Sequence, residues 1–170
     1  VGEERVLLLM LDVFTDWLTA FPAKRRTANY TIMGFIQHAG MNKIRNCRID
    51  DAPELVKACK HHKRAYETSP PYVHQANGLI ESHNRIEIFG TKCSLEQCGA
   101  PLCFWPFACI HLAFSRNIYP IGDKESPYER KFLKGPFQGL RIPFFARVRF
   151  KQNLKIEKSK DTHKVCLLYT

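Results

Sequence analysis

The hydrophobic pattern of the chain begins with an unbroken apolar run over Val6–Leu11, which ends at Asp12. Such a run is typical of an inner strand that is buried on both faces of a sheet. Trp17–Pro22 continues the apolar pattern. We therefore predict that these two segments pair as a hairpin through a turn at Phe14–Asp16.

Strands and helices then alternate along the chain. Apolar residues recur with helical spacing before Gly40, which predicts an amphipathic helix that ends at this glycine. Asp51 precedes Pro53 and is placed to cap a second helix. The predicted elements are helices at residues 29–38, about 51–62, about 78–98 and about 104–117, strands at 44–49 and 65–68, and a loop at 69–77.

This order predicts an α/β fold, in which functional groups gather at the carboxyl ends of strands. From Tyr119 onward proline, glycine and lysine become frequent, and Arg141–Lys151 alternates like a strand. Val165–Tyr169 is a second such segment, cut short by the end of the chain. We therefore divide the chain into a core at residues 1–120 and a basic linker with a partial β module at 121–170.

Charge is distributed unevenly. The net charge is +10, and residues 111–170 contribute +8 of it, from 13 basic and 5 acidic side chains. A basic surface of this kind favours a polyanionic partner, of which nucleic acid is the commonest. The alternative is a basic protein whose charges serve only its solubility.

Seven cysteines are present without any Cys-x-x-Cys pair, which favours reduced thiols in an intracellular compartment. A zinc site among Cys93, Cys98, Cys103, Cys109 and His111 is the weaker interpretation, because the spacings do not match common zinc sites. The most apolar stretch, Leu102–Phe114, is too short to cross a membrane, so we expect no membrane partner.

Three carboxylates carry the candidate chemistry. Asp12 and Asp50 each end a predicted strand, and Glu81 lies near the start of the long helix after the loop. Carboxylates brought together repel one another unless a divalent cation neutralises them, and magnesium suits such a site. The alternatives are turn or cap roles for the aspartates, a solvated helix position for Glu81, and exchange of Asp12 with Asp16 or of Asp50 with Asp51.

Three motifs resemble the catalytic segments of retroviral and retrotransposon integrases: LDVFTDWLTAFP at residues 11–22, DDAPEL at 50–55 and SPPYVHQANGLIESHNR at 69–85. Two further motifs, SPYE at 126–129 and RIPFFARV at 141–148, resemble the segment that trails the core in copia-type elements. The resemblance implies an RNase H-like mixed sheet flanked by helices. It also implies that Asp12, Asp50 and Glu81 are the catalytic acids and the ligands of two Mg²⁺ or Mn²⁺ ions.

The implied activity is metal-dependent 3′-end processing and strand transfer of DNA, by the integrase of an LTR retrotransposon polyprotein. The resemblance also implies DNA as partner, a homo-oligomer in the full-length protein, and a nuclear location. Thirty residues separate Asp50 from Glu81, fewer than is usual in that family. This shortening favours the alternative, an inactive or domesticated DNA-binding remnant. The candidate DNA-binding residues are Gln75, Asn77, Asn84, Arg85, Lys92, Arg147, Arg149 and Lys151.

Overall fold

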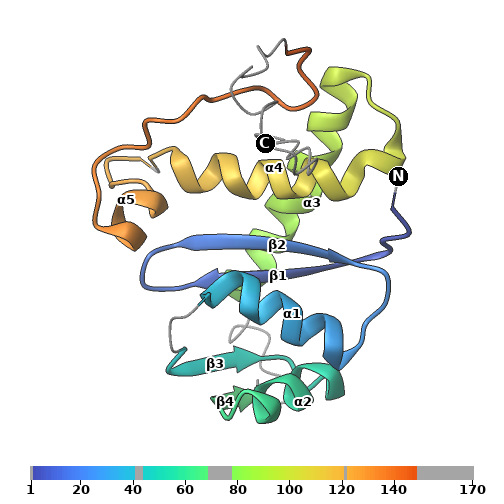
Figure 1. The fold of residues 1–170 in the computed structure, drawn as a ribbon, viewed down its shortest axis with the longest axis vertical. Helices are drawn as coiled ribbons and strands as arrows, with labels where there is room; N and C mark the ends of the chain where they lie inside the picture. Colours follow the sequence, from blue (N-terminus) through green and yellow to red (C-terminus); the bar gives the residue numbers. More distant parts are fainter. Residues whose placement is uncertain (1, 41–43, 69–77, 121, 149–170) are drawn as a thin grey trace, which may run out of the picture.

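The computed structural model describes residues 2–40, 44–68, 78–120 and 122–148. Over these ranges the chain is a mixed α/β structure, which confirms the predicted class (Figure 1). In chain order the elements are β1 (Val6–Asp12), β2 (Trp17–Ala23), α1 (Ala28–Ala39), β3 (Asn46–Ile49), α2 (Pro53–His61), β4 (Ala65–Thr68), α3 (Gly78–Cys98), the short 3-10 helix η2 (Leu102–Phe104), α4 (Trp105–Ile118) and α5 (Pro127–Phe132).

The predicted elements within the described core are confirmed, with ends that shift by about two residues. Gly40 ends α1 as expected, at φ 57° with its N–H donating to the carbonyl of Ile36. The predicted Asp51 cap is wrong: Ala52 holds the N-cap position of α2, which has no side-chain cap. Helix α5 was not predicted, because six residues are too few for apolar periodicity to emerge. The loop predicted at 69–77 lies outside the described residues.

Strands β1 and β2 form an antiparallel hairpin in which Asp12 pairs with Trp17. Successive side chains of β1 point to opposite faces, and both faces are covered. Leu8 and Met10 pack toward Phe35 of α1. On the other face, the leucines at positions 7, 9 and 11 pack with Leu18, Ala20, Cys109 and Ala113 of β2 and α4.

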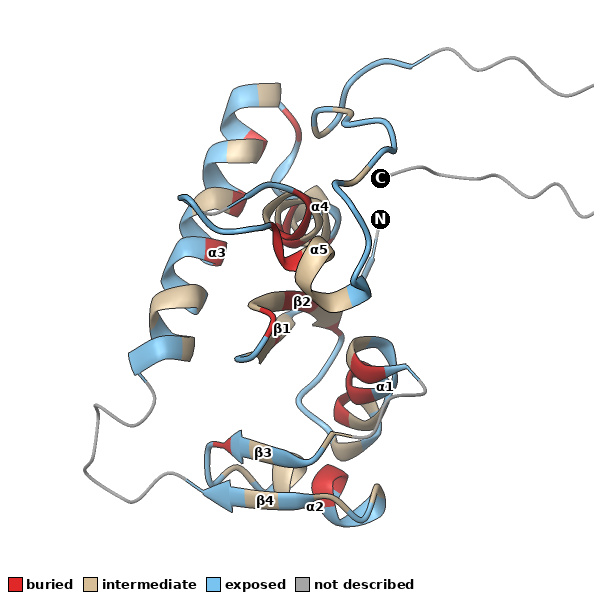
Figure 2. Cartoon of the chain, turned by 90° about the vertical axis from the view of Figure 1, so that its left-hand side faces the viewer, coloured by how far each residue is buried: buried red, intermediate tan, exposed pale blue. Residues whose placement is uncertain are grey.

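Strands β3 and β4 form a separate parallel pair, with Asn46 opposite Ala65. Ile49 of β3 and the fully buried Ala58 and Cys59 of α2 join Met10 and Phe35 in one hydrophobic cluster. Helix α1 therefore lies beside both small sheets and links them through this cluster (Figure 2). The mixed sheet that was predicted as a single unit is present as two two-stranded pieces.

Helices α3 and α4 pack against each other above the hairpin (Figure 1). A Cβ atom at Gly90 of α3 would lie 2.6 Å from Leu112 Cδ2, so a larger residue there would require the Leu112 side chain to shift. Leu95, Ala100 and Ala108 form a further core cluster beneath this contact. No helix in the described ranges combines the length and the apolar character that a membrane crossing requires.

The strand predicted at Arg141–Lys151 is wrong for the part that is described. Residues 141–148 form no strand, and Ala146 N–H donates to Pro143 O in a turn next to Phe145, which has φ 60°. The segment contacts α4, where His111 Nε2 lies 2.9 Å from the carbonyl oxygen of Ile142, and η2, where the Phe104 and Phe145 ring centroids are 5.1 Å apart. Residues 149–151 and the predicted strand at Val165–Tyr169 lie outside the described residues.

Candidate functional site

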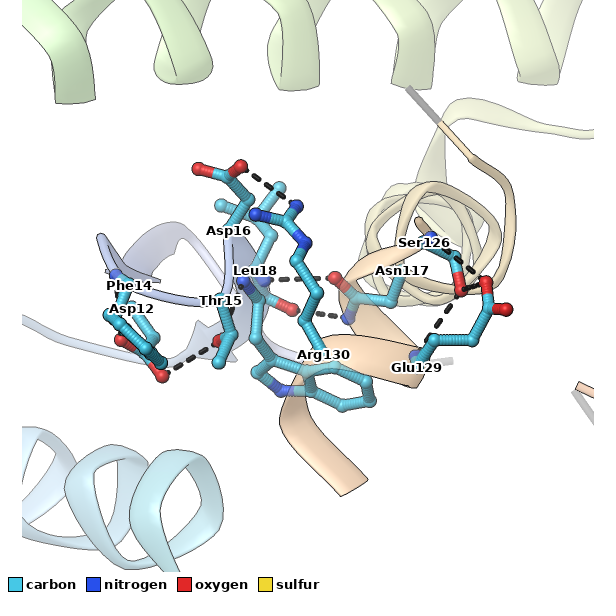
Figure 3. Close-up of polar contacts among 10 residues, drawn as sticks. Asp12, Phe14, Thr15, Asp16, Leu18, Asn117, Ser126, Glu129 and Arg130 are labelled. Carbon is cyan, nitrogen blue, oxygen red and sulfur yellow. Dashed lines mark hydrogen bonds and ion pairs between the residues drawn. The ribbon is translucent and has the colours of Figure 1, made fainter. Parts of the chain in front are cut away.

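Asp12 ends β1 and its carboxylate is used locally in the hairpin turn. One carboxylate oxygen accepts a hydrogen bond from Phe14 N–H at 3.1 Å, and the other accepts one from the Thr15 hydroxyl at 2.7 Å (Figure 3). Asp16 closes the turn at φ 57°, a left-handed conformation that aspartate tolerates. The geometry of Asp12 is that of a turn carboxylate, which was the alternative role left open by the sequence.

Helix α5 lies against this turn and brings cations to it. Arg130 forms an ion pair with Asp16 at 2.8 Å (Figure 3). Lys131 Nζ lies 4.5 Å from the centre of the Trp17 ring and donates to the carbonyl of His38 at 3.2 Å. Burial lowers the pKa of the Lys131 ammonium, and the nearby Asp12 carboxylate partly offsets that effect. The end of β1 is therefore a partly buried set of interleaved charges.

His38 of α1 borders the same region. Its Nδ1 lies 2.9 Å from the Thr19 hydroxyl oxygen. Burial lowers the pKa of His38 to about 4, with a smaller contribution from the Lys131 charge. His38 is therefore neutral at pH 7, and it adds no positive charge beside Asp12.

Asp50 and Glu81 lie at other elements than Asp12. Asp50 is exposed and follows β3, and Glu81 is exposed in the first turn of α3, the helix predicted to carry it. Strands β1 and β3 belong to different sheets, so the predicted adjacency of the strands that lead to Asp12 and Asp50 is wrong. Within the described ranges, which include all three acids, no three His, Cys, Asp or Glu side chains are gathered closely enough to hold a metal ion.

The candidate DNA-binding residues of α3 share its exposed side with Glu81. Asn84, Arg85 and Lys92 are all exposed, and residues four and eleven positions after Glu81 fall on the same helical face. Arg147 is exposed in the segment after α5. Gln75, Asn77, Arg149 and Lys151 lie outside the described residues, so their placement stays a prediction.

Two buried polar residues were missed by sequence reasoning. Asn117 of α4 accepts from Leu18 N–H at 2.9 Å and donates to Leu18 O at 2.7 Å, which satisfies the backbone groups of this residue of β2 (Figure 3). Glu87 of α3 is fully buried, and neither of its carboxylate oxygens has a hydrogen-bond partner. The available signal was periodicity, because Glu87, Thr91 and Leu95 follow the four-residue spacing of one buried helix face.

Comparison with known proteins places this geometry in context. No model of a known protein family matches the chain. The chain is 24% identical over 148 residues to the retrovirus-related Pol polyprotein from transposon RE1 of Arabidopsis thaliana, and 23% identical over 177 residues to that from transposon RE2. These matches cover 81% and 98% of this chain, which spans only 10% and 12% of those polyproteins.

Solved structures of similar fold include retroviral integrases. The HTLV-2 integrase catalytic core, solved with magnesium in a trimeric form, matches with a TM-score of 0.56 at 19% identity, over 72% of this chain and 82% of that one. The catalytic core of BIV integrase matches with a TM-score of 0.57 at 18% identity, over the same shares. A simian T-cell lymphotropic virus intasome matches with a TM-score of 0.60 at 19% identity, over 86% of this chain and 54% of that one. The chain therefore has the RNase H-like fold of the retroviral integrase catalytic core and is similar in sequence to a short segment of retrotransposon Pol polyproteins, as the motifs predicted.

Proposed function

We propose that the chain is the integrase catalytic-core segment of an LTR retrotransposon polyprotein and that it acts on DNA by metal-dependent 3′-end processing and strand transfer. The observation that carries the proposal is the agreement between two independent likenesses, a Pol polyprotein sequence and an integrase-core fold. Asp12, Asp50 and Glu81 are the acids proposed for the reaction, with Mg²⁺ or Mn²⁺ as cofactor. The HTLV-2 core, solved with magnesium, supports the choice of metal.

The described positions of these acids do not fit a metal ion that all three bind together. Asp12 is engaged by Phe14 and Thr15, and β1 and β3 are not neighbours in one sheet. We therefore derive no chemical step through a metal ion. The proposal concerns which side chains the activity requires, and substitution of each side chain tests it separately.

DNA is the proposed partner, held by phosphate contacts from lysine and arginine. Arg85 and Lys92 extend from the face of α3 that carries Glu81, and the C-terminal third adds most of the positive charge. A nuclear location and a homo-oligomer of the full-length protein complete the proposal. Support for the oligomer comes from the HTLV-2 core, solved in dimeric and trimeric forms.

The test is a DNA cleavage and joining assay with a labelled duplex that ends in the terminal repeat of the element, in Mg²⁺, in Mn²⁺ and in EDTA. We expect products only with metal, and we expect Asp50→Asn or Glu81→Gln to remove them while the Kd for the same duplex stays within about twofold. Asp51→Asn and Asp16→Asn are matched controls that keep activity. Equal loss with Asp51→Asn and none with Asp50→Asn would overturn the assignment of the second acid.

A second candidate function is a non-catalytic DNA-binding remnant, and one observation favours it: among the described residues, which include all three acids, no three His, Cys, Asp or Glu side chains are gathered closely enough to hold a metal ion. The same assay separates the two candidates. Salt-sensitive DNA binding without any metal-dependent product, unchanged by Asp50→Asn, supports the remnant. Metal-dependent product that Asp50→Asn abolishes supports the integrase.

A further inference from the structure

The second half of α2 and the turn after it carry a run of basic residues that contains no acid. Residues 55–66 read LVKACKHHKRAY, with four lysine or arginine side chains and no aspartate or glutamate. Lys57 and Lys60 are exposed, whereas Ala58 and Cys59 between them are fully buried in the cluster that α2 shares with α1 and β3. Because residues three positions apart share one face of a helix, the two lysines lie together on the side of α2 that faces away from the core.

The turn that follows α2 adds a third exposed lysine. Lys63 has φ 50° and donates its N–H to the carbonyl of Lys60, while Arg64 N–H donates to the carbonyl of Cys59. Arg64 then turns back onto the core, where its guanidinium carbon lies 5.4 Å from the centre of the Phe35 ring. Arg64 is therefore used in packing, and Lys57, Lys60 and Lys63 form what we call the α2 basic surface.

Acidic side chains leave the charge of the α2 basic surface uncompensated. Glu54 is the one acid of α2, and its carboxylate pairs with Arg26 at 2.9 Å. The Glu54 side chain is 18% exposed and that of Arg26 is 70% exposed, so the pair presents its guanidinium to solvent. Within the described ranges, the three lysines of the surface have no ion pair and no side-chain hydrogen bond. Their mutual repulsion is relieved when an anion binds.

The make-up of this surface selects among anionic partners. Protein partners are usually anchored by aromatic and other large side chains, and lipid surfaces by apolar side chains that enter the bilayer. The exposed large hydrophobic residues of the described chain include none between positions 44 and 68. Nucleic-acid phosphates are bound by lysine and arginine and need no apolar anchor. The α2 basic surface therefore suits a phosphate backbone better than a protein or a membrane.

The α2 basic surface is distant from the described part of the basic C-terminal third. Helix α2 lies at the bottom of Figure 1 and residues 141–148 lie at the top, at opposite ends of the longest axis, and Figure 2 shows the same separation. We infer that the α2 basic surface is a second DNA-contact surface, which binds the phosphate backbone of a duplex through Lys57, Lys60 and Lys63. The inference rests on DNA as the partner in the proposed function and adds where a contact is made. Since phosphates carry no sequence information, this contact is independent of base sequence.

Lysine footprinting of the unaltered 170-residue chain tests the inference. An amine-acylating reagent is applied in EDTA with and without a duplex of random sequence, and mass spectrometry measures the acylation of each lysine. With DNA at low salt we expect acylation of Lys57, Lys60 and Lys63 to fall by roughly threefold or more, and to recover at high salt as the phosphate contacts are lost. Lys124, which is exposed, is the internal control and should react equally in both samples. Unchanged acylation of the three lysines at saturating DNA would overturn the inference.

The double variant Lys57→Gln/Lys60→Gln measures what the surface contributes to binding. Glutamine keeps the helix propensity of lysine, so the circular dichroism should stay the same. We expect the slope of log Kd against log salt concentration to fall by about 1.8, because each phosphate contact contributes about 0.9. Lys124→Gln/Lys134→Gln removes the same charge from exposed positions elsewhere and should keep the slope. An equal loss of slope in both double variants would show that binding responds to net charge alone and would overturn the inference.

A parallel footprint with polyglutamate in place of the duplex identifies the kind of anion. Protection of the three lysines by polyglutamate and not by the duplex would assign the surface to an acidic protein and would overturn the inference. Protection by the duplex at a lower concentration of negative charge than by polyglutamate supports it. Binding is measured in EDTA, without cleavage or joining of DNA, so failure here is distinguishable from failure of the proposed function.

Discussion

Glu87 is a single side chain that opposes folding of the domain at neutral pH. It is fully buried on α3, and burial raises the pKa of its carboxyl group to about 7. The guanidinium of Arg116 on α4 lowers that pKa in part, without a hydrogen bond to either carboxylate oxygen. The adjacent Cys109 thiol has its pKa raised to about 12, by burial first and by Glu87 second. A buried carboxylate without hydrogen bonds is therefore destabilising once it ionises.

The free energy of unfolding should fall as pH rises through this range. The folded state keeps the Glu87 proton up to about pH 7, whereas the unfolded chain releases it near pH 4.5. Because the folded state binds more protons between these values, stability is lost as pH rises from 4.5 toward 7 and beyond, by roughly 2 to 3 kcal/mol between pH 5 and pH 8. Urea unfolding at pH 5 and at pH 8 measures this difference in the free energy of unfolding.

Glu87→Gln should remove most of that pH dependence, because the amide fits the same space and cannot ionise. Glu96→Gln, an exposed position on the same helix, is the matched control and should keep the dependence of the unaltered chain. An equal pH dependence in the unaltered chain and in Glu87→Gln would show that Glu87 does not retain its proton when folded.

At the scale of elements, α5 illustrates how a short helix is held in place. Ser126 is 1% exposed, and its hydroxyl and backbone form a capping box with Glu129. Phe132 meets Trp17 edge to face at 5.4 Å between ring centroids, and Lys131 lies over the same indole. A helix of six residues has little stability of its own, so the cap and the Trp17 contacts determine whether it forms.

Ser126→Ala should destabilise the protein by about 1 kcal/mol and loosen α5 from the hairpin turn. Trp17 fluorescence reports the loosening, because Trp17 loses its Lys131 and Phe132 neighbours and becomes more exposed. The measurement is made in a Trp105→Phe background, which leaves Trp17 as the only indole. Ser94→Ala, which removes a hydroxyl bonded to the Gly90 carbonyl within α3, is the control and should leave the emission unchanged. An unaltered Trp17 spectrum in Ser126→Ala would mean that α5 docks without its cap.

At the scale of the whole molecule, the C-terminal third contains one segment that contacts α4 and another that carries much of the positive charge. Residues 141–146 are attached to α4 through the bond between His111 and Ile142, and Arg141 lies 4.7 Å from the centre of the Tyr119 ring. Residues 149–170 carry six basic and two acidic side chains, a net of +4. A truncation after Val148 therefore removes charge and keeps the anchored segment, whereas one after Leu140 removes both.

The truncation after Val148 should leave the circular dichroism of the folded domain intact, weaken binding to a random duplex, and flatten the slope of log Kd against log salt concentration. The reason is that each lost phosphate contact removes one unit of counterion release. The truncation after Leu140 should additionally lower Tm, because the α4 surface loses its cover. A folded fragment that ends at Val148 and keeps the full salt slope would contradict a DNA-holding role for residues 149–170.

Local pattern in the sequence was enough to place nearly every strand and helix. The apolar run before Asp12, the glycine after α1 and the spacing along α3 and α4 each act within a few residues, so they could be interpreted without knowing what lies beside them. The motifs also pointed to an RNase H-like integrase fold, which the structural comparisons support. The strand prediction is wrong for residues 141–148, because alternation alone does not supply a partner strand for hydrogen bonding.

What the tertiary structure decided is which distant segments meet. The sequence placed Asp12 and Asp50 at strand ends, but only the pairing of β1 with β2 and of β3 with β4 showed that these ends belong to different sheets. The burial of Glu87 and the bonding of Asn117 to Leu18 likewise depend on how α3 and α4 lie against the hairpin. Strand and helix formation is governed by neighbours along the chain. Whether the residues of a site converge is governed by strand pairing and core packing between residues far apart in sequence. A single sequence carries no direct signal for such long-range contacts.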